Sequence, residues 1–155
     1  MLASFRPLPI VAAVAVALGL SSCAPEYPTQ APLSIQRAGE SLLIASCHPA
    51  TVFEVLVDER SAGLMAETVP RVTEDGLGLQ VAGGEPLDLS RIAPDARFDF
   101  EPGGSISITL VTDIGPLNGD IQLGDEGLST ETWLHRGGQS TGEPCPAPDD
   151  SGSST

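Results

Sequence analysis

The sequence predicts a mainly β fold, an antiparallel β-sandwich of about seven or eight short strands. Glycine and proline account for 17 and 14 of the 155 residues, too many turn-forming positions for a helical bundle. Between those positions, short segments alternate apolar and polar residues, as half-buried strands do. Hydrophobic residues make up 41% of the chain, which is enough to form a core.

Each predicted strand is a short segment with this alternation, often bounded by a turn that contains glycine or proline. In chain order these segments are residues 42–46, 51–58, 77–81, 87–89, 97–101, 105–112, 121–123 and 128–135. The second segment places Phe53, Val55 and Val57 on one face, and the fifth places Phe98 and Phe100 on one face. An immunoglobulin-like arrangement is one member of the sandwich class, and a small β-barrel is the alternative.

The mature part of the sequence contains one candidate helix, residues 61–69 (SAGLMAETV). Ser61 is its expected N-cap, and the helical spacing places Leu64, Met65 and Val69 toward the core. No other segment downstream of the N-terminal region has helical periodicity.

The N-terminal region predicts an export signal. Residues 10–20 (IVAAVAVALGL) form an unbroken apolar run. Eleven helical residues span about 17 Å, little more than half of the hydrocarbon thickness of a bilayer. The run is therefore too short for a transmembrane helix and is typical of the hydrophobic region of a signal peptide.

The residues that follow this run are Leu20-Ser21-Ser22-Cys23, a branched apolar residue, two small residues and a cysteine. They resemble the lipobox of bacterial lipoproteins, and the resemblance covers only the first 23 residues. It implies that cleavage leaves Cys23 as the first residue, joined by a thioether to a diacylglycerol. Two acyl chains hold a protein stably to a membrane, so the resemblance implies an anchor on the extracytoplasmic face of a bacterial membrane. Plain secretion, with cleavage at Ser22-Cys23-Ala24, is the alternative.

The resemblance and the composition together divide the chain into four regions. Residues 1–22 are the signal peptide, 23–33 the lipidated cysteine and a proline-rich tether, 34–146 the β-sandwich domain, and 147–155 a disordered tail. The nine tether residues 24–32 would reach about 28 Å if extended.

The cysteine count fits an exported protein. If Cys23 carries lipid, Cys47 and Cys145 remain, and a disulfide is the default state of such a pair in an oxidising compartment. The alternative is a metal site that also uses His48 and His135. The spacing of these residues is not that of a usual zinc site, so the sequence predicts a Cys47–Cys145 disulfide and no metal or other cofactor.

The charge excludes several functions. The chain has 21 acidic residues, seven arginines and no lysine, a formal charge of −14. No mechanism can use a lysine amine, and no basic surface is present to bind nucleic acid. A strongly acidic domain favours a basic protein surface or a divalent cation as its partner. Calcium is the candidate cation, although no EF-hand spacing is present. The acids in or beside predicted turns are Glu74, Asp75, Asp113, Asp120, Asp125 and Glu126.

No catalytic motif is present in the sequence. The G-x-S-x-G elbow of a serine hydrolase is missing, and the low aromatic content (4%) argues against a sugar-binding platform for a glycoside hydrolase. His48 precedes Pro49, which favours a loop or turn. His135 ends a predicted strand, a position where binding residues often occur.

The sequence therefore predicts a lipid-anchored envelope lipoprotein that acts as a non-enzymatic binding or accessory module. Its partner would be an envelope protein or a small ligand, contacted through edge strands and loops. The alternative is a small extracytoplasmic hydrolase or carrier that uses His135 with nearby acids. A third interpretation is a purely structural envelope protein.

Overall fold

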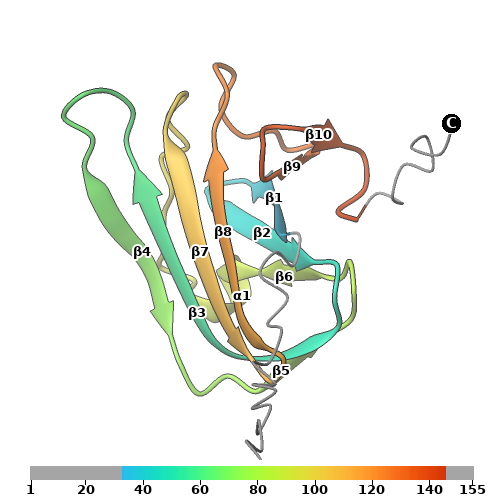
Figure 1. Ribbon diagram of the computed structural model, residues 1–155. Helices are drawn as coiled ribbons and strands as arrows, with labels where there is room; N and C mark the ends of the chain where they lie inside the picture. The colour runs from blue at the N-terminus through green and yellow to red at the C-terminus, as the bar shows by residue number, and fades with distance from the viewer. Residues whose placement is uncertain (1–32, 146–155) are drawn as a thin grey trace, which may run out of the picture.

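Two antiparallel sheets make up the computed structural model, which describes residues 33–145 (Figure 1). The predicted signal peptide, Cys23 and the tail 147–155 lie outside the described residues. Leu33, assigned above to the end of the tether, is the first residue of a strand. The elements are β1 Leu33–Ala38, β2 Ser41–Ser46, β3 Ala50–Arg60, β4 Thr68–Glu74, β5 Leu79–Val81, β6 Pro86–Asp88, α1 Leu89–Ile92, β7 Ser105–Thr112, β8 Gly115–Gln122, β9 Trp133–His135 and β10 Ser140–Thr141.

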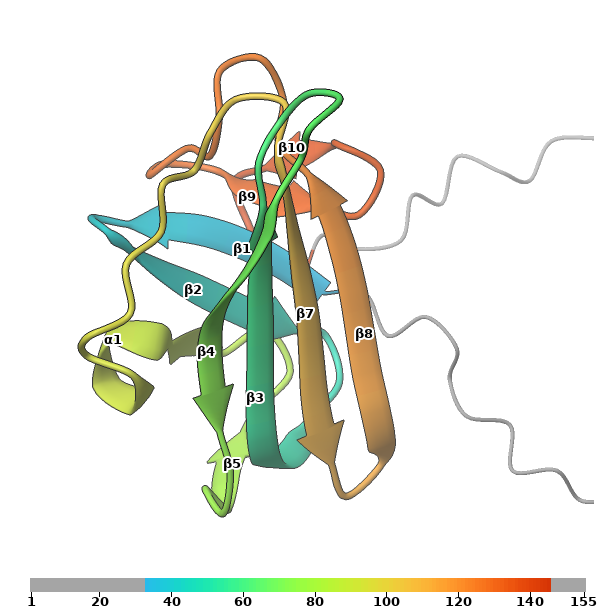
Figure 2. The ribbon, with the colours of Figure 1, turned by 90° about the vertical axis from the view of Figure 1, so that its left-hand side faces the viewer.

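The two sheets differ in the length of their strands. The short-strand sheet has the order β10-β9-β1-β2-β6, and the long-strand sheet has the order β4-β3-β7-β8, with β5 paired to the beginning of β3. Strands of the two sheets cross at a steep angle (Figure 2). Because the sheets do not close on each other, the predicted β-sandwich is confirmed and the β-barrel alternative is wrong.

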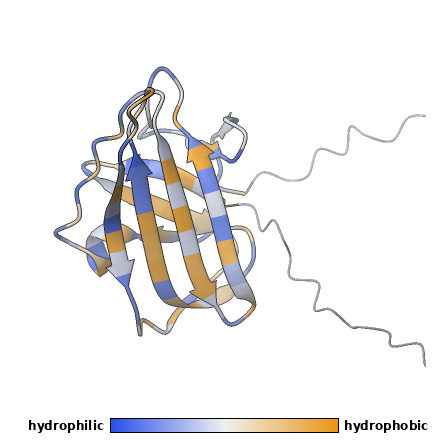
Figure 3. Cartoon of the chain, turned by 60° about the vertical axis from the view of Figure 1, so that its left-hand side comes forward, coloured by the Kyte–Doolittle hydropathy of each residue, from blue (hydrophilic) through white to orange (hydrophobic). Residues whose placement is uncertain are grey.

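The core lies between the inward faces of the two sheets. Hydrophobic and hydrophilic residues alternate along the strands (Figure 3). Each fully buried valine, leucine or isoleucine stabilises the fold by about 1.5–3 kcal/mol relative to an exposed one. The most deeply buried of these side chains are Ile35, Leu42, Ile44, Val52, Val55, Val57, Leu89, Ile106, Ile108, Leu117 and Ile121.

A β-bulge in β3 overturns the predicted facing of Phe53. The register between β3 and β7 shifts between Val52 and Glu54, so two residues lie between the inward-facing Val52 and Val55. The extra residue turns Phe53 outward, and its side chain is 43% exposed. The alternation of apolar and polar residues could not reveal the bulge. In a strictly alternating strand Val52 and Val55 would lie on opposite faces, and both are apolar.

The helix predicted over residues 61–69 is wrong. Residues 61–67 connect β3 to β4, and Thr68 begins β4. The backbone N–H of Ser61 donates to the carbonyl of Glu67 at 3.0 Å, and the Ser61 hydroxyl accepts from the Glu67 N–H at 2.9 Å. These bonds close a hairpin connection where a helix would need Ser61 to cap its first turn.

The helix that does form, α1, lies where the sequence predicted the end of a strand. The Asp88 carboxylate accepts hydrogen bonds from the N–H and the hydroxyl of Ser90, at 2.9 and 2.7 Å. Asp88 is therefore an N-cap, and Leu89 is buried beneath the single turn. The predicted strand 97–101 is also wrong, although Phe98 and Phe100 are both buried, with stacked rings 5.5 Å apart.

Candidate functional site

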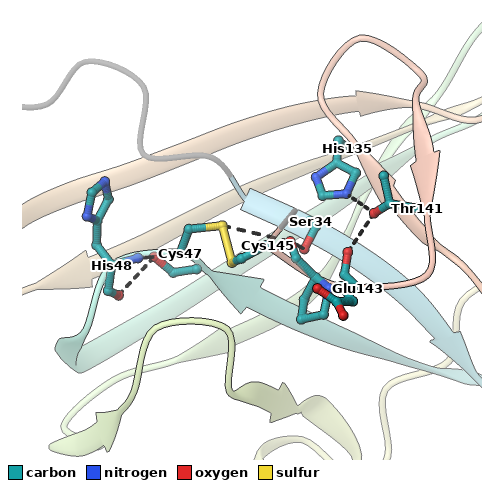
Figure 4. The surroundings of a disulfide bond; sticks show 9 residues. Ser34, Cys47, His48, His135, Thr141, Glu143 and Cys145 are labelled. Atoms are coloured by element: carbon teal, nitrogen blue, oxygen red, sulfur yellow. Dashed lines mark hydrogen bonds between the residues drawn. A yellow bond between two sulfur atoms is a disulfide. The ribbon is translucent and has the colours of Figure 1, made fainter. Parts of the chain in front are cut away.

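The two predicted half-cystines are joined. Cys47 and Cys145 form a disulfide with their Cα atoms 5.5 Å apart and 98 positions apart in the chain. The bond fastens the end of the described chain to the residue after β2 (Figure 4). The Ser34 hydroxyl adds a second connection by donating to the carbonyl of Pro144 at 2.9 Å. The disulfide prediction is thus confirmed, and these two sulfur atoms serve a structural role.

His135 is held by a hydroxyl rather than by an acid. Its Nε2 lies 2.6 Å from Thr141 Oγ1, and the Thr141 hydroxyl donates to the carbonyl of Glu143 at 2.5 Å (Figure 4). Because that donation uses the only hydroxyl proton, Nε2 must be the donor to Thr141. Burial lowers the pKa of His135, which favours the neutral form of the ring. Within residues 33–145, no carboxylate is hydrogen-bonded to this ring.

His48 lies in the turn between β2 and β3. Its backbone N–H donates to the Ser46 hydroxyl at 3.2 Å, and that hydroxyl donates to the His48 carbonyl at 3.1 Å. Figure 4 shows the His48 and His135 rings well apart, on either side of the disulfide. The structure therefore does not bring the two histidines together with the cysteines, as the metal alternative required.

Among the turn acids considered as calcium ligands, Asp113 has a hydrogen-bond partner within the fold. The Asp113 carboxylate accepts from the N–H of Thr51 at 2.8 Å, which links the β7–β8 turn to β3. In the part of the chain that the structure describes, no group of three or more His, Cys, Asp or Glu side chains is placed to hold a metal ion.

The sheet edges are poor docking sites for another strand. Pro70 lies in β4 and Pro116 in β8, the two edges of the long-strand sheet. A proline offers no N–H to a neighbouring strand. The edges of the short-strand sheet are β6, which has three residues and begins with Pro86, and β10, which has two. The described sheet edges therefore offer little backbone for pairing with a further strand.

Three connections pack together at one end of the sandwich, here called the loop end: residues 61–67, 99–104 and 123–132 (top of Figure 1). The Glu101 carboxylate accepts from the N–H of Ala62 at 3.3 Å. The 99–104 connection bonds in turn to the beginning of the third connection. Gly103 N–H donates to the Gly124 carbonyl at 3.3 Å, and Leu123 N–H donates to the Gly104 carbonyl at 2.8 Å.

A buried carboxylate fixes the base of the loop end. Glu59 is only 5% exposed, and its Oε2 lies 2.7 Å from Arg71 Nε. It also accepts from the backbone N–H groups of Asp99, at 3.1 Å, and Phe100, at 2.7 Å. Arg71 makes a second ion pair with the Asp99 carboxylate. A buried charge is tolerated only with such a full set of partners, so Glu59 ties β3 and β4 to the 99–104 connection.

The backbone of Phe100 shows how firmly this connection is held. Its φ is +50°, the left-handed region that residues other than glycine rarely adopt. The Glu59 carboxylate bonds its N–H, and the Arg37 guanidinium lies 5.0 Å from the centroid of its ring. The sequence analysis missed Glu59. Its position two residues beyond Val57 on the inward face of β3 was the available signal.

The tip of the loop end carries two adjacent apolar side chains in full contact with solvent. Leu64 is 105% exposed and Met65 is 95% exposed. The other large exposed apolar residues of the described chain, Phe53 and Ile114, are only 43% and 39% exposed. The prediction that Leu64 and Met65 face the core is therefore wrong, because it depended on the helix that does not form.

Acidic side chains line depressions at the loop end. Three open depressions of about 170, 190 and 890 Å³ lie at the loop end, and the first two flank the β3–β4 connection at Ser61. Three arginines line them, Arg37, Arg60 and Arg71. The acids that line them are Glu59, Glu67, Asp99, Glu101, Asp120, Asp125, Glu126 and Glu131. The loop end therefore has a negative net charge and an apolar tip.

Comparison of the chain with protein-family models, curated proteins and solved structures returns no match. Within residues 33–145, no helix has the length and hydrophobicity needed to cross a bilayer. The chain's own residues and their geometry are therefore the basis for assigning a function.

Proposed function

We propose that the mature protein is a lipid-anchored lipoprotein of the bacterial cell envelope and a non-enzymatic binding module for another envelope protein. The observation that carries the proposal is the exposure of Leu64 and Met65 side by side at the tip of the loop end. Single exposed apolar residues are ordinary, and hairpin connections favour Gly, Asn, Asp and Ser. Two adjacent, fully exposed apolar side chains at such a tip are characteristic of a contact surface.

The proposed anchor rests on Leu20-Ser21-Ser22-Cys23, and the position of β1 is compatible with it. Cys23 lies ten positions before Leu33. The Leu33 side chain packs beside Gly119, in the middle of β8, where even an added Cβ would come within 3.2 Å of it. Leu33, the first described residue, thus lies at the side of the sandwich, a position that suits a tether leading away from the loop end. The Cys47–Cys145 disulfide suits the oxidising compartment that the anchor implies.

The alternative of a small hydrolase gains no support at His135. In a triad of that kind an acid orients the ring of the general base. The partner of Nε2 is instead the Thr141 hydroxyl, which is itself bonded to a backbone carbonyl. This chain of hydrogen bonds fastens β9 to β10 and to the segment that leads to Cys145.

Membrane fractionation of cells that express the full chain tests the anchor. We expect the native protein in the membrane fraction and the Cys23→Ala variant in the soluble extracytoplasmic fraction. The binding role is tested in the same cells with a short crosslinker that reacts with carboxylates, because the chain has no lysine, followed by mass spectrometry of the crosslinked species. We expect one dominant envelope protein. A Cys23→Ala variant that stays on the membrane would contradict the anchor, and a clean lack of any crosslinked protein would contradict the binding role.

A further inference from the structure

We infer that the loop end docks as an apolar plug, with Leu64 and Met65 entering an apolar pocket on a partner protein whose rim carries lysine or arginine. This inference rests on the proposed function and specifies the chemistry of the partner. Three features of the loop end support it: a tip that is exposed, a base that is fixed, and a net negative charge.

The base of the β3–β4 connection is ordered before any partner binds. The two Ser61–Glu67 hydrogen bonds close it, and the Ala62 N–H bonds to the Glu101 carboxylate. An added Cβ at Gly103 would touch the Ala62 Cβ at 3.5 Å, so the neighbouring connection packs directly against this base. Only the residues between Ala62 and Glu67 project. A fixed base lowers the entropy lost when the tip is immobilised by a partner.

The negative charge of the loop end favours a partner whose pocket has a basic rim. Eight acids and three arginines line the depressions at the loop end. The Arg71 guanidinium is engaged with Glu59 and Asp99, and that of Arg37 bonds the Gly39 carbonyl and lies over Phe100. Arg60 makes no ion pair among the described residues, but the acids of the loop end still outnumber its arginines. This excess attracts lysine or arginine on a partner and repels acidic surfaces.

The same charge argues against two other occupants of the surface. A bacterial bilayer containing anionic lipid would repel the acids of the loop end, so insertion of the tip into lipid is disfavoured. A second copy docked through the same end would bring two acidic surfaces together. An apolar pocket with a basic rim on a partner protein is complementary to both the apolar tip and the acids of the loop end.

Photocrosslinking in intact cells tests the inference with the lipidated, full-length protein. A photoreactive amino acid replaces Leu64 in one strain, Met65 in a second and Ile114 in a third. Ile114 is the matched control, because it is an exposed apolar residue at the opposite end of the long-strand sheet. We expect positions 64 and 65 to crosslink to one protein and position 114 not to do so. The crosslinked peptide of the partner should contain apolar residues flanked by lysine or arginine.

Two sets of substitutions test the chemistry separately, with a probe at Ala66, which also lies on the projecting segment. Leu64→Ser with Met65→Ser should lower the crosslink yield by roughly tenfold or more, as expected for loss of apolar anchors. Glu126→Gln with Glu131→Gln should lower it by roughly fivefold at low salt, and less at high salt. The matched charge control, Glu74→Gln with Asp75→Asn at the other end of β4, should leave it unchanged. The melting temperature of each variant shows whether the fold is retained.

Each outcome supports or overturns the inference. Crosslinks from position 114 or elsewhere, with none from 64 and 65, would overturn the plug and leave the proposed binding role intact. Crosslinks from 64 and 65 to lipid, to a second copy, or to a partner insensitive to Glu126 and Glu131 would also overturn it. No protein crosslink from any position, together with none from the short crosslinker, would overturn the binding role itself.

Discussion

The exposed apolar residues at the two ends of the long-strand sheet differ in how their turns are held. At one end, Thr112 and Gly115 enclose a tight turn, with the Thr112 hydroxyl donating to the Gly115 carbonyl at 2.6 Å. Asp113 bonds Thr51 twice, through its N–H at 3.1 Å and its carboxylate at 2.8 Å. Ile114 therefore belongs to a turn that hydrogen bonds hold in place, and it is only 39% exposed.

At the opposite end, the β3–β4 connection is fastened only at its base. Ser61 and Glu67 close it, and the segment between them carries Leu64 and Met65 beyond the reach of any neighbour. Hydrogen bonds from polar residues complete the first turn, whereas the second exposes apolar surface that no other described residue covers.

The largest expected loss of stability comes from removing the disulfide. Replacing Cys47 and Cys145 together by alanine frees a loop of 98 positions, which should lower the free energy of unfolding by about 4 kcal/mol. Urea unfolding of the purified protein measures this. Cys23→Ala is the control, because it removes a cysteine outside this bond. A loss below about 1 kcal/mol would show that the disulfide contributes little.

The next effect concerns the base of the loop end. Glu59→Gln removes the charge that pairs with Arg71 and turns an amide group toward the N–H groups of Asp99 and Phe100. We expect a loss of about 3 kcal/mol in the free energy of unfolding. Glu54→Gln on the same strand should cost far less, since Glu54 makes no ion pair among the described residues. Equal losses from the two variants would contradict the role given to Glu59.

A smaller loss of stability is expected at the β7–β8 turn. Asp113→Ala removes the carboxylate that accepts from Thr51 N–H, which should cost about 1 kcal/mol of unfolding free energy. The matched variant Ile114→Ser changes the adjacent exposed side chain and keeps this bond. Thermal unfolding compares the two, and an Asp113→Ala protein as stable as the native one would mean that water replaces the lost bond without cost.

The smallest effect on stability is expected at the tip. Leu64→Ser with Met65→Ser should change the free energy of unfolding by less than about 0.5 kcal/mol, because neither side chain is buried in the monomer. The same double substitution is expected to weaken binding strongly, so stability and binding separate at this position. A large loss of stability would show that the two side chains pack within the fold after all.

The sequence was sufficient for the features that depend on composition and alternation. It predicted the sandwich, the Cys47–Cys145 disulfide and the strand at residues 105–112, where Ile106, Ile108 and Leu110 all face the core. These predictions succeed because each depends on a strong local pattern or on the cysteine count.

The features that it missed depend on pairing with another strand rather than on the pattern of the segment itself. β4 forms because Thr68–Glu74 pairs with β3, and that pairing outweighs the helical spacing of SAGLMAETV. β1 was missed because its last residues are polar, although Leu33 and Ile35 alternate inward against β2. The exposed tip was missed for the same reason as β4, since Leu64 and Met65 were assigned to the buried face of the helix that does not form.

The most direct test of the account is the ratio of photocrosslinking yields from positions 64 and 114 in intact cells. Both residues are exposed and apolar, and they lie at opposite ends of one sheet. If the loop end is the docking surface, position 64 should give at least about ten times the yield of position 114, to a single basic-rimmed envelope protein. Equal yields, or a higher yield from position 114, would contradict the account.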